Sequence, residues 1–316
     1  MLFIEIVAGL VLLVAGGEAL VRGASALAAR MGVSPLLVGL TVVGFGTSTP
    51  ELVTSLQAAF AGSPGIAVGN VVGSNTANIL LILGLTALIA PVPVERRAFR
   101  RDGTALVLAT GASVAVVLAG ALTRPAGLAL LAGLVGYIAY AYLSERRGPA
   151  GEAAGDPATT VPLAPETTQY SAIVAAALAV GGIGLTILGA RFLVGGATGL
   201  AAQFGVSEAV IGLTVVAVGT SLPELVTGVV AALRRQTDIA LGNVVGSNLY
   251  NILGILGATA AIRPIDVPER IAGFDIWVSV AATVLLLVVA VTGQRVVRAE
   301  GAVLLAAYAA YIAFLV

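Results

Sequence analysis

The segment GTSTPELVTS, residues 46–55, places a proline and a glutamate between two strongly apolar stretches of the chain. A closely similar segment, GTSLPELVTG, occupies residues 219–228. Pro50 and Pro223 each lack a backbone N–H, and each ring clashes with the carbonyl group four residues earlier in a helix. We therefore expect each of these two helices to break into two half-helices.

The composition indicates an integral membrane protein. Of the 316 residues, 59% are hydrophobic and 10% are charged, and the mean hydropathy is +1.06. A membrane-spanning helix needs about 20 apolar residues. On this basis the sequence predicts an all-α polytopic membrane protein with ten transmembrane helices. The predicted spans are residues 3–25, 34–60, 66–90, 104–122, 126–144, 171–195, 207–233, 239–261, 275–293 and 297–316.

The arginines predict how the chain is oriented, because cytoplasmic loops of membrane proteins are enriched in basic residues. With both termini outside, twelve of the 16 basic residues fall in inner loops and four fall outside. We therefore predict an N-out, C-out topology. The chain contains no cysteine and no histidine, which excludes disulfides, thiolate or imidazole metal sites and histidine-based proton chemistry. A net charge of zero gives no indication of a nucleic-acid partner.

The chain contains an internal repeat. Residues 33–84 align without a gap to residues 206–257, with 32 identities in 52 positions and an offset of 173 residues. The offset contains five predicted spans, an odd number, so the two copies should cross the membrane in opposite directions. This inverted-repeat arrangement is typical of secondary transporters. We divide the chain into a first five-helix repeat (1–144), a cytoplasmic linker rich in Gly, Pro, Ala and Thr (145–170) and a second five-helix repeat (171–316).

Polar residues of the repeats predict a cation site. Glu51 and Glu224 follow directly after the two prolines, in the first turn of a half-helix, where the helix dipole favours negative charge. A carboxylate inside a bilayer needs a partner, and no arginine lies near the middle of these spans. Four i, i+4 pairs each place two oxygen-bearing side chains on one helix face. These pairs are Thr47 and Glu51, Ser74 and Asn78, Thr220 and Glu224, and Ser247 and Asn251. Such oxygen donors suit Ca²⁺ and Na⁺, and they suit zinc, copper or iron poorly.

The segments GTSTPEL and GTSLPEL, with the two copies of GNVVGSN and a following Asn, resemble the α1 and α2 repeats of the cation/Ca²⁺ exchanger superfamily. The resemblance is closest to the prokaryotic sodium/calcium exchanger branch. It implies a Na⁺/Ca²⁺ antiporter in a prokaryotic cytoplasmic membrane, which alternates access by sliding the first and sixth spans past the other eight. It implies no enzymatic activity and no organic cofactor, and we expect a monomer.

The resemblance also implies a ligand set. The family's central acids correspond to Glu51 and Glu224, and its amide ligand in the third span corresponds to Asn78. The positions that match its hydroxyl and carbonyl ligands are Thr47, Ser48, Thr220, Ser221, Ser74 and Ser247, with backbone oxygens at Gly44 and Ala217. At the equivalent place in the eighth span some members carry an aspartate, whereas this chain has Asn251. The site then carries two formal negative charges, which leaves the stoichiometry and the ion preference open.

Further roles remain open at this point. Asn70 and Asn243 could cap helices or bind the ion, and Asn75 and Asn248 are expected to join adjacent helices by hydrogen bonds, outside the ligand set. H⁺/Ca²⁺ exchange and K⁺-assisted exchange on the same scaffold are the alternative functions. The proton-coupled branch typically has a GNATEL-like segment where this chain has GTSTPEL, which favours sodium. An intramembrane hydrolase or a passive channel is a third class, but the sequence lacks paired catalytic aspartates, a nucleophile set and an HExxH segment.

Overall fold

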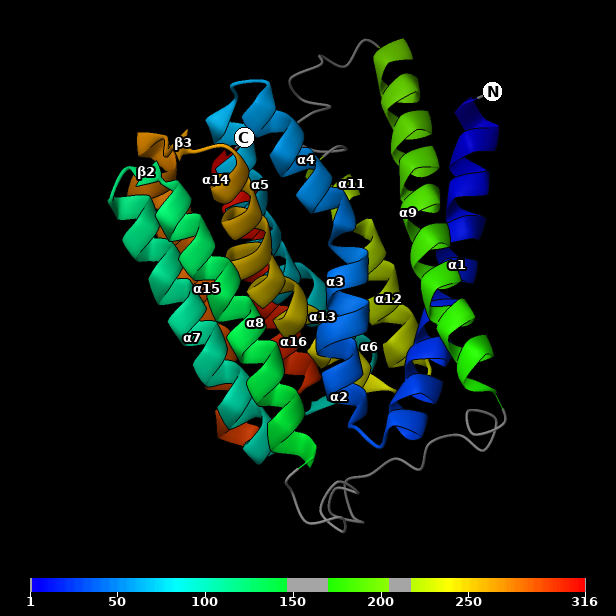
Figure 1. The fold of residues 1–316 in the computed structure, drawn as a ribbon. Coiled ribbons are helices and arrows are strands. Elements are labelled where there is room, and N and C mark those ends of the chain that lie inside the picture. Colours follow the sequence, from blue (N-terminus) through cyan, green and yellow to red (C-terminus); the bar gives the residue numbers. More distant parts are fainter. Residues whose placement is uncertain (1, 147–169, 205–216, 316) are drawn as a thin grey trace.

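The protein is a bundle of long helices (Figure 1), seen in a computed structural model that describes residues 2–146, 170–204 and 217–315. The first half contains α1 (Leu2–Met31), α2 (Pro35–Val38), η1 (Gly39–Val43), α3 (Gly44–Thr47), α4 (Thr49–Phe60), α5 (Pro64–Ala77), η2 (Asn78–Leu83), α6 (Gly84–Ile89), α7 (Arg96–Leu118) and α8 (Arg124–Arg146). The second half contains α9 (Ala172–Gln203), α11 (Ala217–Thr220), α12 (Leu222–Leu233), α13 (Thr237–Leu249), η5 (Tyr250–Leu256), α14 (Gly257–Ile262), η6 (Ile271–Asp275), α15 (Ile276–Gly293) and α16 (Arg298–Leu315). Segments labelled η are turns of π-helix that continue their neighbouring helices.

Most of the predicted spans correspond to helices of the structure. Among the described residues, eight helices are long and apolar enough to cross a membrane, and the bent pair formed by residues 35–47 and 49–60 would make a ninth. The predicted span 207–233 is described only from Ala217 onward, because residues 205–216 lie outside the described ranges. Residues 147–169, most of the predicted linker, lie outside them too.

Two predictions need correction. The helix predicted over 104–122 begins at Arg96 and ends at Leu118, because the polar residues before the apolar window continue the same helix. The all-α prediction missed four short strands, β1 (Val92–Pro93), β2 (Ala121–Leu122), β3 (Ile265–Asp266) and β4 (Arg295–Val296). Two-residue strands show no alternation of apolar and polar residues by which the sequence could reveal them.

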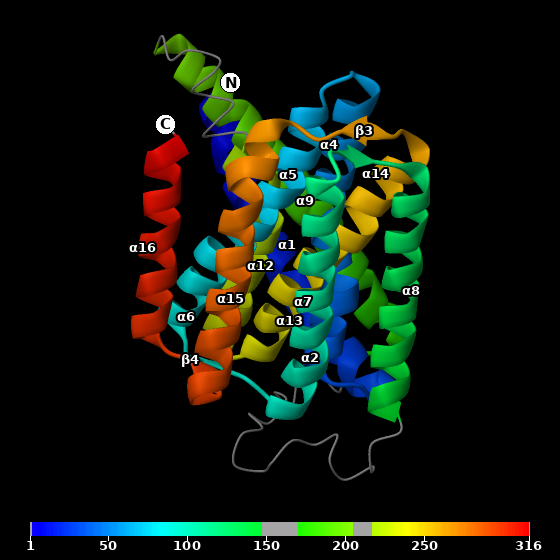
Figure 2. The same ribbon diagram turned by 90° about the vertical axis from the view of Figure 1, so that its left-hand side faces the viewer.

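The four strands form two antiparallel ladders, each joining one half of the chain to the other. In the first, Val92 pairs with Val296; in the second, Leu122 pairs with Ile265. The β2–β3 ladder lies at the upper end of the bundle (Figure 1), whereas β4 lies at the lower end (Figure 2). Strand β3 lies 173 residues after β1, and β4 lies 174 residues after β2, so the two ladders are one contact repeated with the same register.

Helices α1 and α9 form an antiparallel pair at one edge of the bundle (Figure 1). Glycines recur along the seam between them. A Cβ atom added at Gly16 would lie 2.6 Å from the backbone nitrogen of Thr186, and one at Gly189 would lie 2.8 Å from the carbonyl oxygen of Gly9. The absence of side chains at these positions therefore lets the two backbones touch.

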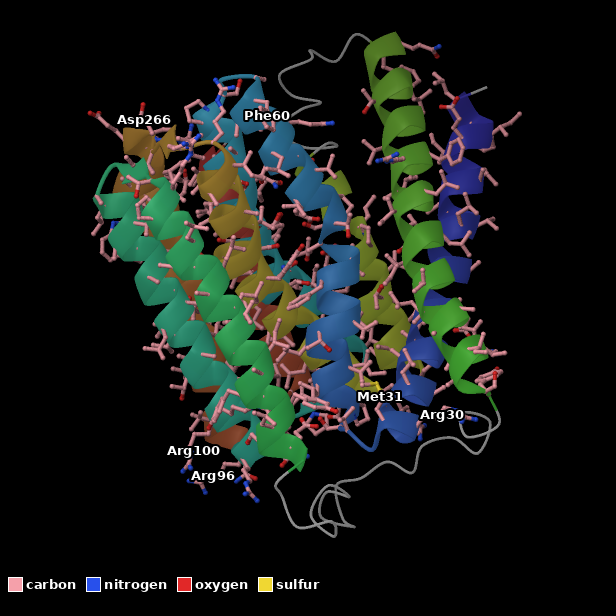
Figure 3. All side chains as sticks on the ribbon, in the orientation of Figure 1. Arg30, Met31, Phe60, Arg96, Arg100 and Asp266 are labelled. Carbon is pink, nitrogen blue, oxygen red and sulfur yellow. The ribbon has the colours of Figure 1, made fainter. Side chains whose placement is uncertain are left out.

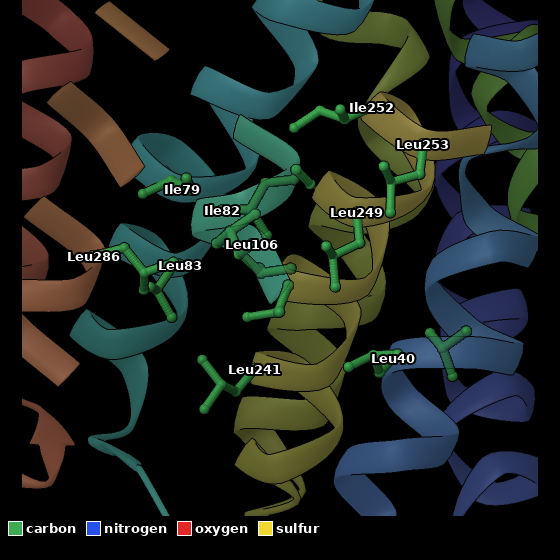
Figure 4. Close-up of a cluster of buried hydrophobic side chains, with 14 of the residues drawn as sticks. Leu40, Ile79, Ile82, Leu83, Leu106, Leu241, Leu249, Ile252, Leu253 and Leu286 are labelled. Carbon is green, nitrogen blue, oxygen red and sulfur yellow. The ribbon is translucent and has the colours of Figure 1, made fainter. Parts of the chain in front are cut away.

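The apolar core lies around the α13–η5 helix, which is almost completely enclosed by its neighbours. In Figure 4, Leu241 and Leu249 of this helix face Ile82 and Leu83 of η2. Both termini lie at the same end of the bundle (Figure 2). Arg30, Arg96 and Arg100 gather at the end opposite to Phe60 and Asp266 (Figure 3).

Candidate ion-binding site

Both proline-containing segments contain the predicted helix breaks. Ser48 separates α3 from α4 with φ −82° and ψ 11°, and Ser221 separates α11 from α12 with φ −90° and ψ 9°. The two parts of the first broken helix meet at an angle of 43°. Each break falls two residues before the proline, which occupies the second position of the following half-helix, where no backbone N–H is required.

Two hydrogen bonds cross between the breaks. The Ser48 hydroxyl donates to Glu224 Oε1 at 2.8 Å, and the Ser221 hydroxyl donates to Glu51 Oε1 at 3.3 Å. Each serine at a break thus holds the carboxylate of the other repeat. Both glutamates are 1% exposed. The two acids predicted from the sequence therefore lie together, buried where the two broken helices meet.

The unbroken helices of each repeat contribute a second pair of crossed hydrogen bonds. Asn78 Nδ2 donates to Asn248 Oδ1 at 3.1 Å, and Asn251 Nδ2 donates to Asn75 Oδ1 at 2.9 Å. Asn78 is the first residue of η2, and Asn251 lies in η5. π-helical turns of this kind often occur at functional sites. These bonds join the α5–η2 helix to the α13–η5 helix. The serine–glutamate bonds likewise join the broken helix α3–α4 to the broken helix α11–α12.

Four oxygens of this cluster have no hydrogen-bond donor. Within the part of the chain that the structure describes, they are Glu51 Oε2, Glu224 Oε2, Asn78 Oδ1 and Asn251 Oδ1. They form two pairs related by the repeat, and their elements are in contact, since α4 packs against η5 and α12 packs against η2. A buried acceptor without a partner is costly, so such oxygens are normally satisfied by a donor or a cation. A hard cation is one kind of partner that satisfies such oxygens.

The remaining predicted ligands of the first repeat lie close to this cluster. Thr47 is fully buried, and its hydroxyl donates to the carbonyl oxygen of Val43 at 3.0 Å. The Gly44 carbonyl oxygen, predicted as a ligand, accepts a hydrogen bond from the Ser247 hydroxyl at 3.2 Å. Ser74 is buried one helical turn before Asn78.

The second repeat is described less completely. Thr220 is half-buried and is the last residue of α11, directly before the break at Ser221. Ala217 begins the same short helix, next to residues outside the described ranges, and nothing is described of its side chain. Its carbonyl oxygen remains a predicted ligand.

Two asparagines act on the glutamate backbones. Asn70 Nδ2 donates to the carbonyl oxygen of Glu51 at 3.0 Å, and Asn243 Nδ2 donates to that of Glu224 at 3.3 Å. Neither caps a helix, because α5 begins at Pro64 and α13 begins at Thr237. The sequence had left capping and ligation open for both. The sequence signalled a role for these asparagines only by placing one in each repeat. Their hydrogen bonds to the glutamate carbonyl oxygens are seen only in the structure.

The donor set defines the kind of ion that fits. It consists of carboxylate, amide, hydroxyl and carbonyl oxygens, which prefer hard cations. Across the described ranges there is no group of three or more His, Cys, Asp or Glu residues that could hold a metal ion. The site therefore contributes two formal charges from Glu51 and Glu224, with neutral oxygens around them.

A comparison with protein families identifies the chain. The family model described as sodium/calcium exchanger protein matches residues 1–143 and 174–316. The chain belongs to the sodium/calcium exchanger family. The match covers both halves and omits residues 144–173, which contain the whole predicted linker.

Individual relatives of this exchanger-family chain cover nearly all of its length. It is 38% identical over 314 residues to the putative antiporter CaxA of Alkalimonas amylolytica, covering 98% of this chain and 96% of that protein. It is 34% identical to the sodium/calcium exchanger MaX1 of Methanosarcina acetivorans, covering 99% of this chain and 98% of that protein. The fold is similar to a structure of the sodium-calcium exchanger NCX_Mj soaked with Na⁺ and Sr²⁺, with a TM-score of 0.84, 30% identity and 99% of each chain covered. Membership of a transporter family agrees with the expected lack of enzymatic activity.

Proposed function

We propose that this chain is an antiporter that exchanges Na⁺ for Ca²⁺ across the cytoplasmic membrane of a prokaryote. One observation carries the proposal: among the described residues, four buried oxygens lack donors, in two repeat-related pairs, at the place where two broken helices meet. Names of full-length relatives support the same pair of ions.

The charges of the site favour these ions. Either one Ca²⁺ or two Na⁺ would neutralise Glu51 and Glu224, so the two cargoes can compete for the same oxygens. In addition to these glutamates, we propose that the ligand set draws on Thr47, Ser48, Ser74, Asn78, Thr220, Ser221, Ser247, Asn251 and the backbone oxygens of Gly44 and Ala217.

We further propose ten spans in two inverted five-helix repeats with both termini outside. The two strand ladders support this, because they are the same contact placed at opposite ends of the bundle. The position of Arg30, Arg96 and Arg100 at the end opposite to the termini (Figures 2 and 3) supports an inner location for that end. We propose a monomer as the transporting unit.

Access to the site would alternate by movement of α1 and α9 relative to the other helices. The close glycine seam between these two helices supports their movement as one unit. Each carboxylate is bonded to a serine of the other repeat, so the ion site would stay intact while this pair moves past it.

The test is uptake of ⁴⁵Ca²⁺ into proteoliposomes loaded with Na⁺ and diluted into Na⁺-free buffer. Glu51→Gln and Glu224→Gln each remove one of the two charges at the site, so we expect each to abolish uptake. Glu269→Gln makes the same chemical change at an exposed residue outside the site, and we expect it to transport normally. Full uptake by either site variant would contradict the proposed centre.

Gradient controls separate the alternatives. Uptake that persists without Na⁺ and follows a pH gradient would indicate H⁺/Ca²⁺ exchange. Uptake that needs K⁺ together with Na⁺ would indicate K⁺-assisted exchange. This alternative is worth testing because Asn251 is an amide where some exchangers have an acid, which changes the charge of the site. Absence of uptake under every gradient would mean that Ca²⁺ is not the cargo.

A further inference from the structure

Asn251 raises a problem of orientation. A carboxylate presents an oxygen to a cation whichever way its side chain turns, but an amide presents an oxygen at one end and an NH₂ group at the other. An NH₂ group facing a cation would repel it. If Asn251 binds the ion, the protein needs a device that keeps its oxygen toward the site.

Asn75 supplies such a device. Its Oδ1 accepts the hydrogen bond from Asn251 Nδ2 at 2.9 Å. Its own Nδ2 donates to the backbone carbonyl oxygen of Asn248 at 3.4 Å. A backbone carbonyl can only accept, so it determines which end of the Asn75 amide faces it. The Asn75 oxygen then faces Asn251 and takes up its NH₂ group, which leaves Asn251 Oδ1 as the free acceptor.

We propose that Asn75 is a positioning residue that holds the amide of Asn251 with its oxygen toward the transported cation. This inference rests on the proposed function of the site. Asn75 belongs to the first repeat and Asn251 to the second, so the first half of the chain orients a ligand of the second. Asn75 is 3% exposed, so the bond to Asn251 is made inside the bundle.

In the repeat-related bond from Asn78 to Asn248, the orientation of the accepting amide is less constrained. Asn248 Oδ1 accepts from Asn78 Nδ2, but Asn248 Nδ2 is among the buried donors that have no acceptor within the described ranges. Its amide has no second bond to fix which end faces Asn78. The device is therefore complete only for Asn251, the ligand at which an acid occurs in some exchangers.

The experiment measures Ca²⁺ binding to the purified full-length protein by isothermal titration calorimetry, and Na⁺-driven ⁴⁵Ca²⁺ uptake alongside it. Asn75→Leu removes the acceptor at nearly constant volume. We expect Ca²⁺ affinity to fall about tenfold, which corresponds to about 1.4 kcal/mol, the upper end of the range for a lost hydrogen bond between neutral groups. The half-saturating Ca²⁺ concentration should rise with little change in maximal rate. Asn75→Ala tests the same loss without the risk that leucine disturbs folding.

Rescue distinguishes orientation from simple structural damage. In the double variant Asn75→Leu with Asn251→Asp, the carboxylate needs no orienting partner, so affinity should return to that of Asn251→Asp alone. Asn75→Leu with Asn78→Asp adds the same charge to the site but leaves Asn251 unoriented, and it should stay about tenfold weaker than Asn78→Asp alone.

Each contrary result has a definite meaning. If the wild-type protein does not bind Ca²⁺, the proposed function fails before the inference is reached. If Asn75→Leu and Asn75→Ala both bind Ca²⁺ with the affinity of the wild-type protein, Asn75 does not position the ligand. If Asn251→Asp and Asn78→Asp both rescued Asn75→Leu, the added charge would explain the rescue. If neither rescued it, the loss would be structural damage. Either result would overturn the proposal.

Discussion

Ser48 and Ser221 occupy the two points at which a transmembrane helix is interrupted, and each donates its hydroxyl proton to a glutamate of the other repeat. A hydrogen bond to a buried carboxylate contributes about 1.5–3 kcal/mol. The bond also fixes one oxygen of the carboxylate, which leaves the second oxygen as the one available to an ion. In the proposed site, the two serines would therefore determine which carboxylate oxygens face a bound ion.

Replacing either serine should weaken the site more than it weakens the fold. We expect Ser48→Ala and Ser221→Ala each to lower Ca²⁺ affinity about tenfold, because the opposite carboxylate loses its donor and turns more freely. Calorimetric titration of the purified variants with Ca²⁺ measures this. Ser279→Ala, at a buried serine of α15 outside the site, is the matched control. Equal loss in all three variants would show that the effect is general destabilisation.

At this scale the sequence indicated which buried polar residues to propose as ligands, but it did not show how they pair. Glu51 and Glu224 are charged residues in apolar spans. Such residues are usually functional, and they can be recognised from the local sequence alone. The bond from Ser48 to Glu224 joins residues far apart in the chain, so it depends on how the two repeats face each other. The same holds for Asn75 and Asn251, whose pairing cannot be read from either segment alone.

Among the elements, the α1–α9 pair depends on glycines at the contact between the two helices. A Cβ atom at Gly182 would lie 2.7 Å from the carbonyl oxygen of Gly16, whereas one at the neighbouring Gly181 would meet nothing within 4 Å. The two glycines are adjacent in the chain and differ only in the face of α9 on which they lie. Gly182 maintains the contact between the helices, and Gly181 faces open space.

This difference gives a matched pair of variants. Gly182→Ala should push α1 and α9 apart and cost about 1–3 kcal/mol, as overpacked interiors do, with slower Na⁺-driven Ca²⁺ uptake. Gly181→Ala should be neutral or slightly stabilising, since alanine favours helix over glycine by about 1 kcal/mol. Thermal unfolding in detergent, followed by light scattering, compares the two. Equal melting temperatures would show that the seam tolerates separation.

The helix breaks illustrate what could be predicted about elements. Pro50 and Pro223 predicted that a break would occur, since the effect of proline on a helix is local. The positions of the breaks, at Ser48 and Ser221, reflect where the upstream half-helices end. The start of α7 at Arg96 was missed because hydropathy detects the membrane-embedded part of a helix and not its polar extension.

For the whole molecule, the charge at the proposed site would determine how transport responds to voltage. Two glutamates and otherwise neutral ligands give the empty site a formal charge of about −2 among the described residues. One Ca²⁺ or two Na⁺ restore neutrality, and a third Na⁺ makes the loaded site positive. Exchange of more than two Na⁺ for each Ca²⁺ would therefore move net charge across the membrane.

We expect such electrogenic exchange. In vesicles loaded with Na⁺, each cycle would carry one positive charge outward while Ca²⁺ enters, so an inside-positive potential should speed uptake and an inside-negative potential should slow it. Potentials set with valinomycin and K⁺ gradients provide the measurement, and vesicles without protein are the control. Uptake that does not change with voltage would indicate two Na⁺ per Ca²⁺.

The inverted arrangement stays a prediction about the molecule as a whole, made because an odd number of predicted spans separates the two copies. The contacts between the copies could not be predicted. They are made by ladders too short to have a sequence pattern and by side chains that meet only after both halves have folded.

The two ladders also bear on where this architecture came from. Val92 with Val296 and Ile265 with Leu122 are equivalent pairs under exchange of the halves. Two identical five-helix chains inserted in opposite directions would make this one contact twice, once on each side of the membrane. The ladders are thus the contacts that an antiparallel homodimer of such chains would make, and gene fusion would have joined two chains that already paired in this way. After fusion, each half became free to diverge, as Asn75 and Asn248 illustrate by orienting equivalent ligands to unequal degrees.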